Sequence, residues 1–338
     1  MKAVLFPGDR TAIITEVEDP SPQPHEVVVR VRASAICRSD MSVYYGNPIV
    51  GTDVGTVVPG HEPAGEIVEV GSAARGVSLG DRVAIYLALG CMTCDWCRRG
   101  YLMLCAQWRC LGFDVHGGDA EYVVVPAANC LQLPPEMSFA EGALSTDMLG
   151  TQYSAQERLG VSGANPVVIF GMGPMGLAGV MVASRRGARV IAVDPIQARL
   201  DVAREVGADV TIVPDEATVV EELRDQTGGG AETLIDCSGN PRAQNWALDA
   251  AAKFGKVALV GESRETTINP SDQLLRKLVT VMGAWYFPIG QYGDISRFVV
   301  AHKLPLERMV SHRFPLDDAA EAFRLFDQRQ AEKVVFQM

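Results

Sequence analysis

The sequence predicts an α/β protein of two domains: a β-rich domain and a domain built on a doubly wound parallel sheet. Its 338 residues correspond to two domains at a typical size of roughly 150 residues each. The first part of the chain has short β-branched runs bounded by Gly and Pro, whereas from Pro166 apolar strands alternate with helical stretches. With 48% hydrophobic and 21% charged residues, the composition indicates a folded chain and not a disordered one.

The first part of the chain is expected to form a compact, strongly bent sheet or barrel. Its predicted strands cover residues 26–32, 66–70, 81–85 and 121–125. Gly and Pro interrupt these runs at short intervals, as is typical of strongly curved antiparallel sheets.

Near residue 150 the pattern changes to strands and helices in alternation. Strands are predicted at residues 167–170, 190–193, 232–236 and 256–260, with one helix ending near Arg186 and others at 198–206 and 243–252. Continuous apolar strands between helices indicate a parallel sheet that is covered on both faces. After about Ile289 the tail holds one more helix, at 316–326, and a final strand at 333–336.

Charge and hydropathy exclude several classes of partner. The chain carries 30 basic and 41 acidic side chains, for a net charge of −11, so a broad nucleic-acid surface is not expected. No stretch approaches the roughly 18 consecutive apolar residues of a membrane span. The first ten residues contain too short an apolar run for a signal peptide, so a cytoplasmic protein is expected.

A Gly-rich turn follows the predicted strand at 167–170 and opens a predicted helix. Its residues are Gly171, Met172, Gly173, Pro174, Met175 and Gly176. Glycines at these positions permit a tight turn and close approach of the backbone to a pyrophosphate, which the helix N-terminus then binds. The alternative is a Gly-rich turn without a ligand, but the strand-to-helix context favours a dinucleotide site.

The second strand of this domain ends at an acidic residue, Asp194, eighteen residues after Gly176. A carboxylate there accepts hydrogen bonds from the adenosine ribose and repels a 2′-phosphate, so the sequence favours NAD over NADP. Arg199 either reaches the same ribose or is an ordinary solvated helix residue.

Four of the eight cysteines are crowded into one short segment: Cys91, Cys94, Cys97 and Cys105. Four thiolates at this spacing can close a tetrahedral shell around zinc and leave no place for substrate. An iron–sulfur cluster is the rival interpretation, but a single four-cysteine lobe beside an NAD domain favours structural zinc. Cys110, Cys130 and Cys237 require no function.

Two further residues, Cys37 and His61, become candidate functional residues through a resemblance to a known family. Gly60-His61-Glu62 with Gly65 and Gly71 resembles the zinc motif of the medium-chain, zinc-dependent alcohol dehydrogenases. Cys37 lies upstream and the four-cysteine lobe downstream at that family's distances, and the Gly-rich turn comes later in the family's order. The resemblance runs from the N-terminus to the last strand.

The resemblance implies a division of the chain into domains. A GroES-like catalytic domain would cover residues 1–150, with a zinc lobe at about 90–110. A Rossmann NAD domain would cover 151–288, and the chain would return to the catalytic domain over 289–338.

The resemblance also implies a catalytic zinc, and so two zinc ions per chain. Its ligands would be Cys37, His61 and Asp147, because the stretch 144–148 is similar to the family branch that carries Asp in this place. Glu62 would be the alternate fourth ligand. Asp147 could instead be a carboxylate that only caps a helix start.

Further roles follow from the same resemblance. Ser39 corresponds to the family's proton-relay hydroxyl, although it could be only a turn-forming residue. Many members then use a His where this chain has Ser42, so water, Tyr44 or Tyr45 would have to replace it. The resemblance places Arg38 and Lys333 at the pyrophosphate and Thr151 at the nicotinamide, and the alternative for each is a solvated surface residue. Leu87, Trp108, Trp285 and Tyr286 fall in segments that line substrate pockets, or are simply core residues.

The predicted function is NAD-linked, zinc-dependent oxidation of an alcohol, with a secondary alcohol, diol or polyol as the first choice. One alternative is the same machinery acting mainly as a carbonyl or iminium reductase, or on threonine, formaldehyde or an aminocyclitol. Another is a non-catalytic NAD-binding protein. The predicted partners are a small-molecule alcohol or carbonyl and further copies of the chain. Those copies would pair through residues 278–282 into a tetramer or a dimer.

Overall fold

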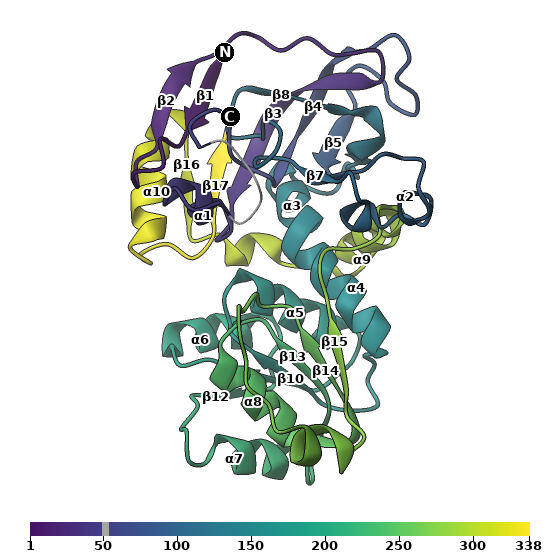
Figure 1. Ribbon diagram of the computed structural model, residues 1–338, viewed down its shortest axis with the longest axis vertical. Helices are drawn as coiled ribbons and strands as arrows, with labels where there is room; N and C mark the ends of the chain where they lie inside the picture. Colours follow the sequence, from purple (N-terminus) through teal and green to yellow (C-terminus); the bar gives the residue numbers. More distant parts are fainter. Residues whose placement is uncertain (49–53) are drawn as a thin grey trace. The chain divides into compact units, whose positions relative to one another are not determined.

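A computed structural model describes residues 1–48 and 54–338 and divides the chain into two compact units (Figure 1). Unit 1 contains Met1–Asp147 and Pro288–Met338, and unit 2 contains Met148–Phe287. The chain therefore starts in unit 1, builds unit 2 and returns. No helix among the described residues is both long and apolar enough to cross a membrane.

Unit 1 is organised around a sheet of seven strands. Along the main path the order is β16-β17-β3-β4-β5-β9, and β8 also pairs with β3. The strands of this sheet are β3 (Glu26–Ile36), β4 (Pro63–Val70), β5 (Arg82–Ile85), β8 (Tyr122–Pro126), β9 (Cys130–Gln132), β16 (His312–Phe314) and β17 (Val334–Gln337). Two further pairs of strands form small sheets of their own: β1 (Lys2–Leu5) with β2 (Ile13–Glu16), and β6 (Ala88–Leu89) with β7 (Arg109–Cys110). The helices are α1 (Asp40–Tyr44), α2 (Asp95–Arg98), α3 (Phe139–Leu144), α9 (Tyr292–His302) and α10 (Ala319–Asp327).

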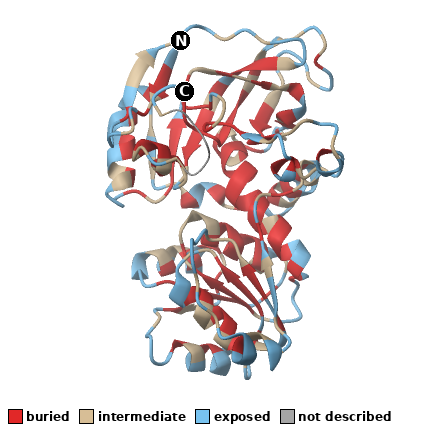
Figure 2. Cartoon of the chain, in the orientation of Figure 1, coloured by how far each residue is buried: buried red, intermediate tan, exposed pale blue. Residues whose placement is uncertain are grey.

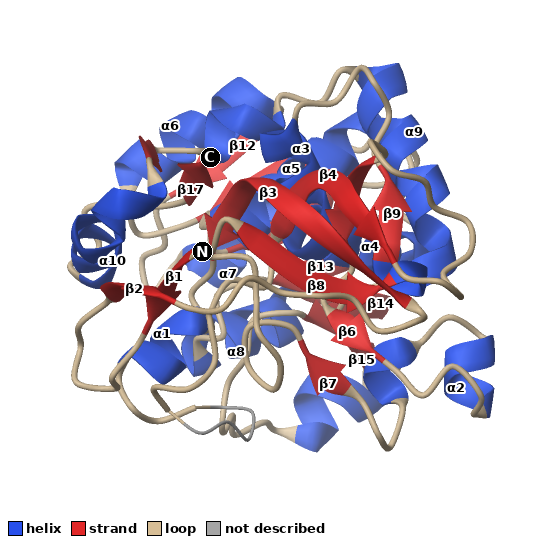
Figure 3. Cartoon of the chain, turned by 90° about the horizontal axis from the view of Figure 1, so that it is seen from above, coloured by secondary structure: helices blue, strands red, loops and turns tan. Residues whose placement is uncertain are grey.

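The central strands of unit 1 are long and bent, as Figure 3 shows for β3 and β4. Their register shifts twice, between Val28 and Val29 and between Val31 and Ala33. Such bulges bend a strand and increase its twist. The last strand, β17, adds antiparallel to β3, with Val334 opposite Ile36, so the C-terminal segment completes the sheet that the N-terminal segment begins.

Unit 2 is a parallel sheet of six strands in the order β12-β11-β10-β13-β14-β15. Its strands are β10 (Val167–Phe170), β11 (Val190–Val193), β12 (Val210–Ile212), β13 (Ala231–Asp236), β14 (Ala251–Leu259) and β15 (Thr280–Gly283). Its helices are α4 (Gly150–Leu159), α5 (Pro174–Arg185), α6 (Gln197–Val206), α7 (Val219–Gln226) and α8 (Pro241–Ala250).

The strands β10 and β11 of unit 2 are buried along their whole length, and Figure 2 shows the sheet around them largely in red. Val168, Phe170, Ile191, Leu234 and Val257 form its core with apolar residues of α7 and α8. Burial of every residue in β10 and β11 requires cover on both faces, which is why these strands are continuously apolar in the sequence. The predicted α/β class, a β-rich domain with a doubly wound parallel sheet, is confirmed.

Candidate metal and cofactor sites

Four potential metal ligands meet in the interior of unit 1. They are Cys37, His61, Glu62 and Asp147, whose ligand atoms all lie within 4.8 Å of one another. His61 Nε2 lies 3.4 Å from Asp147 Oδ2 and 3.8 Å from Glu62 Oε1, and Cys37 Sγ lies 3.8 Å from Asp147 Oδ2. Ligands bound tetrahedrally to zinc lie about 3.5 Å apart, given bonds of about 2.0–2.3 Å. The spacing and the sulfur, nitrogen and oxygen donors therefore fit a zinc ion.

The backbone places these ligands at the ends of neighbouring strands. Cys37 directly follows β3, and His61 and Glu62 directly precede β4. Gly60 has φ +92°, and a Cβ there would lie 2.3 Å from Asp119 Oδ1. A Cβ on Gly65 would lie 2.0 Å from the carbonyl oxygen of Arg30. Close packing of the backbone, and not only the metal, therefore requires these glycines around His61.

Asp147 is supplied by a π-helical turn, Ser145–Leu149, between α3 and α4. The hydroxyls of Ser145 and Thr146 donate to the carbonyl oxygens of Gly142 and Ala143 at 2.7 Å and 3.1 Å. Hydroxyls that bond back to the preceding turn disturb the α-helical pattern, and single π-turns are frequent at functional sites. Asp147 lies inside this turn and is not the N-cap residue of either flanking helix.

Asp40 supports two of the ligands, and the sequence analysis missed it. Its Oδ1 lies 2.8 Å from His61 Nδ1, and its Oδ2 accepts the backbone N–H of Cys37 at 2.8 Å. A carboxylate on one imidazole nitrogen fixes the ring so that the other nitrogen can bind a metal. Although burial alone would lower it, Asp40 and Asp147 hold the pKa of His61 well above its usual value, so the cluster favours a cation here.

Lys333 also belongs to this cluster. Its Nζ lies 2.7 Å and 2.8 Å from the two carboxylate oxygens of Glu62, and both side chains are buried. The resemblance assigned Lys333 to the cofactor pyrophosphate, but in the structure its ammonium forms an ion pair with Glu62. The sequence does not show that Lys333 contacts Glu62, because the two residues are 271 positions apart.

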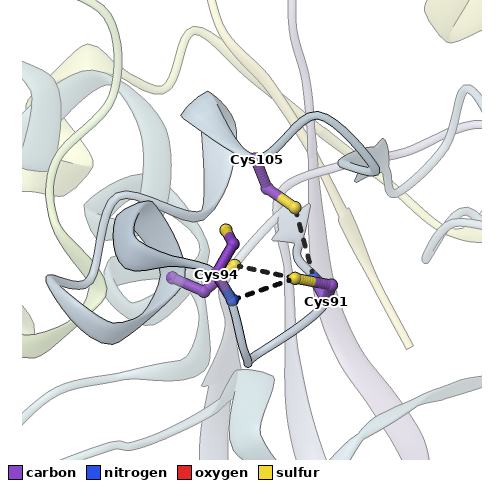
Figure 4. A group of neighbouring side chains, drawn as sticks. Cys91, Cys94 and Cys105 are labelled. Atoms are coloured by element: carbon purple, nitrogen blue, oxygen red, sulfur yellow. Dashed lines mark hydrogen bonds between the residues drawn. The ribbon is translucent and has the colours of Figure 1, made fainter.

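The four-cysteine segment forms a second cluster, in the lobe between β6 and β7. The ligand sulfurs of Cys91, Cys94, Cys97 and Cys105 lie within 4.8 Å of one another. Figure 4 shows Cys91, Cys94 and Cys105 gathered in this lobe. Cys91 Sγ accepts the backbone N–H of Cys94 at 3.3 Å and the hydroxyl of Thr93 at 3.4 Å. The Thr93 hydroxyl and nearby backbone N–H groups lower the pKa of Cys91 to about 5. Four sulfurs so arranged fit a closed, tetrahedral metal site.

The Gly-rich turn of unit 2 has the geometry that a pyrophosphate needs. Gly171 has φ +86°, and a Cβ on Gly176 would lie 1.8 Å from the carbonyl oxygen of Gly171. Gly173 is the N-cap residue of α5, and Pro174 takes the first helical position, so Met175 and Gly176 lie in the first turn. Free N–H groups at the start of this helix form an anion site. The buried Thr151 hydroxyl has no hydrogen-bond partner among the described residues and is free for a ligand.

Asp194 does more than the sequence analysis assigned to it. Its Oδ2 accepts the backbone N–H of Met172 in the Gly-rich turn at 2.7 Å, and its Oδ1 accepts that of Ile196 at 2.8 Å. Arg199 Nη1 lies 3.9 Å from the same carboxylate. Asp194 therefore ties the Gly-rich turn to the end of β11, while each oxygen retains a lone pair for a ribose hydroxyl.

The remaining predicted residues lie as follows. Ser39 is the N-cap residue of α1, and Ser42 Oγ donates to its carbonyl oxygen at 2.8 Å. Tyr44 is buried against Phe6, whereas the Tyr45 hydroxyl donates to Asp327 at 2.5 Å. Arg38 Nη1 lies 3.5 Å from the carbonyl oxygen of Phe326.

The predicted pocket residues are divided between the units. In unit 1, Leu87 is fully buried and Trp108 is half-buried. In unit 2, Trp285 and Tyr286 stack with their ring centroids 4.9 Å apart, and Trp285 is exposed. Leu87 is therefore a core residue.

Comparison with known proteins decides the family. Residues 23–135 match the alcohol dehydrogenase GroES-like domain, and residues 174–301 match the zinc-binding dehydrogenase family. The L-threonine 3-dehydrogenase of Pyrococcus horikoshii is 34% identical over 97% of this chain and 95% of its own. The sorbitol dehydrogenase of Bombyx mori is 33% identical over 98% of this chain and 97% of its own. The chain is a zinc-dependent medium-chain dehydrogenase.

Solved structures agree with this family membership. The alcohol dehydrogenase TADH of Thermus sp. ATN1 superimposes with a TM-score of 0.93 at 28% identity, covering 100% of this chain and 99% of that one. The predicted enzyme class, an oxidoreductase of the NAD-dependent alcohol dehydrogenase type, is therefore confirmed. Among the described residues, the chain presents two clusters of potential metal ligands and a Gly-rich strand-to-helix turn, in the order expected along the sequence.

Proposed function

We propose that this dehydrogenase oxidises a secondary alcohol, diol or polyol with NAD as the hydride acceptor. The observation that carries the proposal is the buried cluster of Cys37, His61 and Asp147, a set of donors that suits a catalytic zinc with one open position. When bound there, zinc would act as a Lewis acid that stabilises an alkoxide, and NAD would take up the hydride. We further propose a second, structural zinc in the four-cysteine lobe.

The chain's own residues would orient the reactants and move the proton. Asp40 fixes the His61 ring, and the π-turn holds Asp147 against His61. Ser39, two residues after Cys37, would accept the alcohol proton in the first relay step. Because Ser42 bonds to the Ser39 carbonyl and Tyr44 is buried, we propose that solvent water takes the proton onward.

NAD would bind at the Gly-rich turn, where the first N–H groups of α5 would hold the pyrophosphate. The carboxylate of Asp194 would accept from the ribose hydroxyls and repel a 2′-phosphate. The proposal requires that NAD supports faster turnover than NADP. Faster turnover with NADP would overturn the role given to Asp194.

Two relatives guide the choice of substrate. L-Threonine carries a secondary hydroxyl at the position named in L-threonine 3-dehydrogenase, and sorbitol is a polyol. We therefore expect NADH formation, followed at about 340 nm, from at least one compound in a panel of secondary alcohols, vicinal diols, polyols and L-threonine. Metal analysis should find two zinc ions per chain, falling to one in Cys37→Ser. If no compound reacts and Cys37→Ser leaves the metal content unchanged, the catalytic-zinc proposal fails.

A further inference from the structure

The metal-ligand cluster of unit 1 holds one donor more than an open site needs. Cys37, His61 and Asp147 provide three ligands, and Glu62 is a fourth within the same 4.8 Å. Three protein ligands leave a coordination position for substrate, whereas four close the shell around zinc. The state of Glu62 therefore decides whether the site is open.

In the structure Glu62 is turned to a cation of the chain itself. Both of its carboxylate oxygens contact Lys333 Nζ, at 2.7 Å and 2.8 Å. Glu62 is 0% exposed and Lys333 is 2% exposed, so water does not screen this ion pair. A buried carboxylate that lost this partner would turn to the nearest remaining cation, because an unpaired buried charge is strongly unfavourable.

The sheet fixes the position of Lys333. The three strands β17, β3 and β4 are neighbours in the sheet. Lys333 directly precedes β17, Cys37 directly follows β3 and Glu62 directly precedes β4, so all three lie at the same end. The carbonyl oxygen of Lys333 also accepts the backbone N–H of Ser311 at 2.9 Å. The ammonium is therefore held beside Glu62 by the register of the sheet.

We propose that Lys333 is a positioning residue that holds Glu62 away from the catalytic metal and so keeps one coordination position open. This inference rests on the proposed function, because it requires a metal ion at Cys37, His61 and Asp147. The competing explanation is that Lys333 only neutralises a buried acid and stabilises the sheet. The two explanations differ in what happens at the metal when Lys333 is removed.

The test uses the full chain loaded with Co²⁺, whose visible absorption reports coordination, and imidazole as a small ligand for the open position. A Co²⁺-loaded Cys37→Ser variant supplies the background from the four-cysteine lobe. In the natural chain, imidazole should shift the difference spectrum. In Lys333→Met, Glu62 should enter the metal shell and weaken imidazole binding by about tenfold or more. Lys333→Arg should bind imidazole as the natural chain does.

The double variant Lys333→Met, Glu62→Gln decides the interpretation. It lacks the competing carboxylate, so imidazole affinity should return to that of the natural chain. Lys256→Met is the control, because it removes the ammonium of an exposed lysine in unit 2 whose described side-chain bond goes to a carbonyl oxygen, that of Leu159. If Lys333→Met does not fold, Lys333→Gln keeps a hydrogen-bond donor for Glu62 without the charge, and should still weaken imidazole binding.

Two results would separate failure of this inference from failure of the proposed function. If Lys333→Met or Lys333→Gln keeps its full Co²⁺ content and binds imidazole with unchanged affinity, Lys333 has only a structural role. If Cys37→Ser has the same Co²⁺ content and spectrum as the natural chain, there is no metal at this cluster. In that case the proposed function itself is wrong.

Discussion

The single carboxylate of Asp40 contacts two potential metal ligands of unit 1. One oxygen lies on His61 Nδ1 and the other accepts the N–H of Cys37, so a single side chain sets the imidazole orientation and the turn after β3. An asparagine in its place could satisfy only one of these contacts, because it has one accepting oxygen. Its NH₂ group, which only donates, would face either the Cys37 N–H or His61 Nδ1, and each of these is itself a donor when His61 Nε2 binds a metal.

We expect Asp40→Asn to lower metal affinity at the cluster by about 10- to 100-fold, the range found for groups that orient metal ligands. The measurement is the rate of zinc release to a chromophoric chelator. The first zinc ion to be released is taken as the ion of this cluster. Asp81→Asn is the control, since Asp81 also accepts a backbone N–H, from Ser78, but lies on the surface. Equal release rates in Asp40→Asn and the natural chain would contradict the role of Asp40.

Asp119 is expected to make unit 1 less stable as the pH rises. The carboxyl is fully buried, Oδ1 accepts the hydroxyl of Ser34 at 2.6 Å, and Oδ2 has no hydrogen-bond partner among the described residues. Burial, with Asp40 nearby, raises the pKa of Asp119 from 3.8 to about 7. Between these values the native state binds more protons than the unfolded chain, so the free energy of unfolding falls as the pH rises and is lowest above pH 7.

Replacing Asp119 by Asn should remove this pH dependence. Asn keeps an acceptor for Ser34 and carries no charge, so the variant should be more stable than the natural chain at about pH 8.5, by at most about 4 kcal/mol, with little difference near pH 4.5. Urea denaturation across this range measures the difference. Asp225→Asn, an exposed residue of α7, is the control. A difference that does not grow with pH would show that Asp119 is not the responsible group.

At the scale of elements, the four-cysteine lobe has little besides its sulfurs to hold it together. Its helix α2 has four residues and its two strands, β6 and β7, have two each. Elements this short are not stable alone, so a metal in the lobe should supply much of its folding free energy. A Cβ on Gly90 would lie 2.5 Å from Cys97 Sγ, which shows how closely the chain surrounds the cluster.

Cys97→Ser should therefore release one metal ion per chain and unfold the lobe locally. Hydrogen exchange should become fast within residues 90–110, while the rest of unit 1 keeps its protection. Cys130→Ser, which changes a thiol outside both clusters, should have neither effect. Unchanged exchange in the lobe of Cys97→Ser would mean that it is stable without the metal.

The elements also show what local sequence can and cannot predict. The apolar runs of β10 and β11 and the turn at Gly171 were predictable, because each is specified by consecutive residues. The strands β1, β2 and β12 were not predicted, because each is only partly buried and lacks the fully buried apolar run of β10 and β11. The π-turn at Asp147 depends on two hydroxyls bonding back along the helix.

The same limit applies to the candidate site. The Cys37 and His61 motifs are local and could be found, but the roles of Asp40 and Lys333 depend on three-dimensional contacts. Lys333 reaches Glu62 only through the pairing of β17 and β4 on either side of β3. A sequence that specifies each strand does not by itself state which strands become neighbours.

At the scale of the whole molecule, the open edge of the unit 2 sheet is where we expect copies of the chain to pair. β15 is the last strand of this sheet, and no strand among the described residues pairs with its outer side. Apolar side chains around it are exposed: Val281 by 40%, Leu278 by 59% and Leu275 by 68%. A flat apolar edge of this kind pairs readily with another chain.

We propose that two copies pair through β15 across a two-fold axis, which would extend the sheet from one chain into the next. Val281→Lys would place two ammonium groups near each other at this axis, so we expect the dissociation constant to rise by at least about tenfold. Sedimentation velocity over a range of concentrations measures it. Val213→Lys is the matched control, because Val213 is also an exposed valine, by 51%, and follows β12 at the opposite edge of the same sheet. If Val281→Lys and Val213→Lys sediment alike, the copies associate through another surface, and the exposed apolar side chains of β15 require a different explanation.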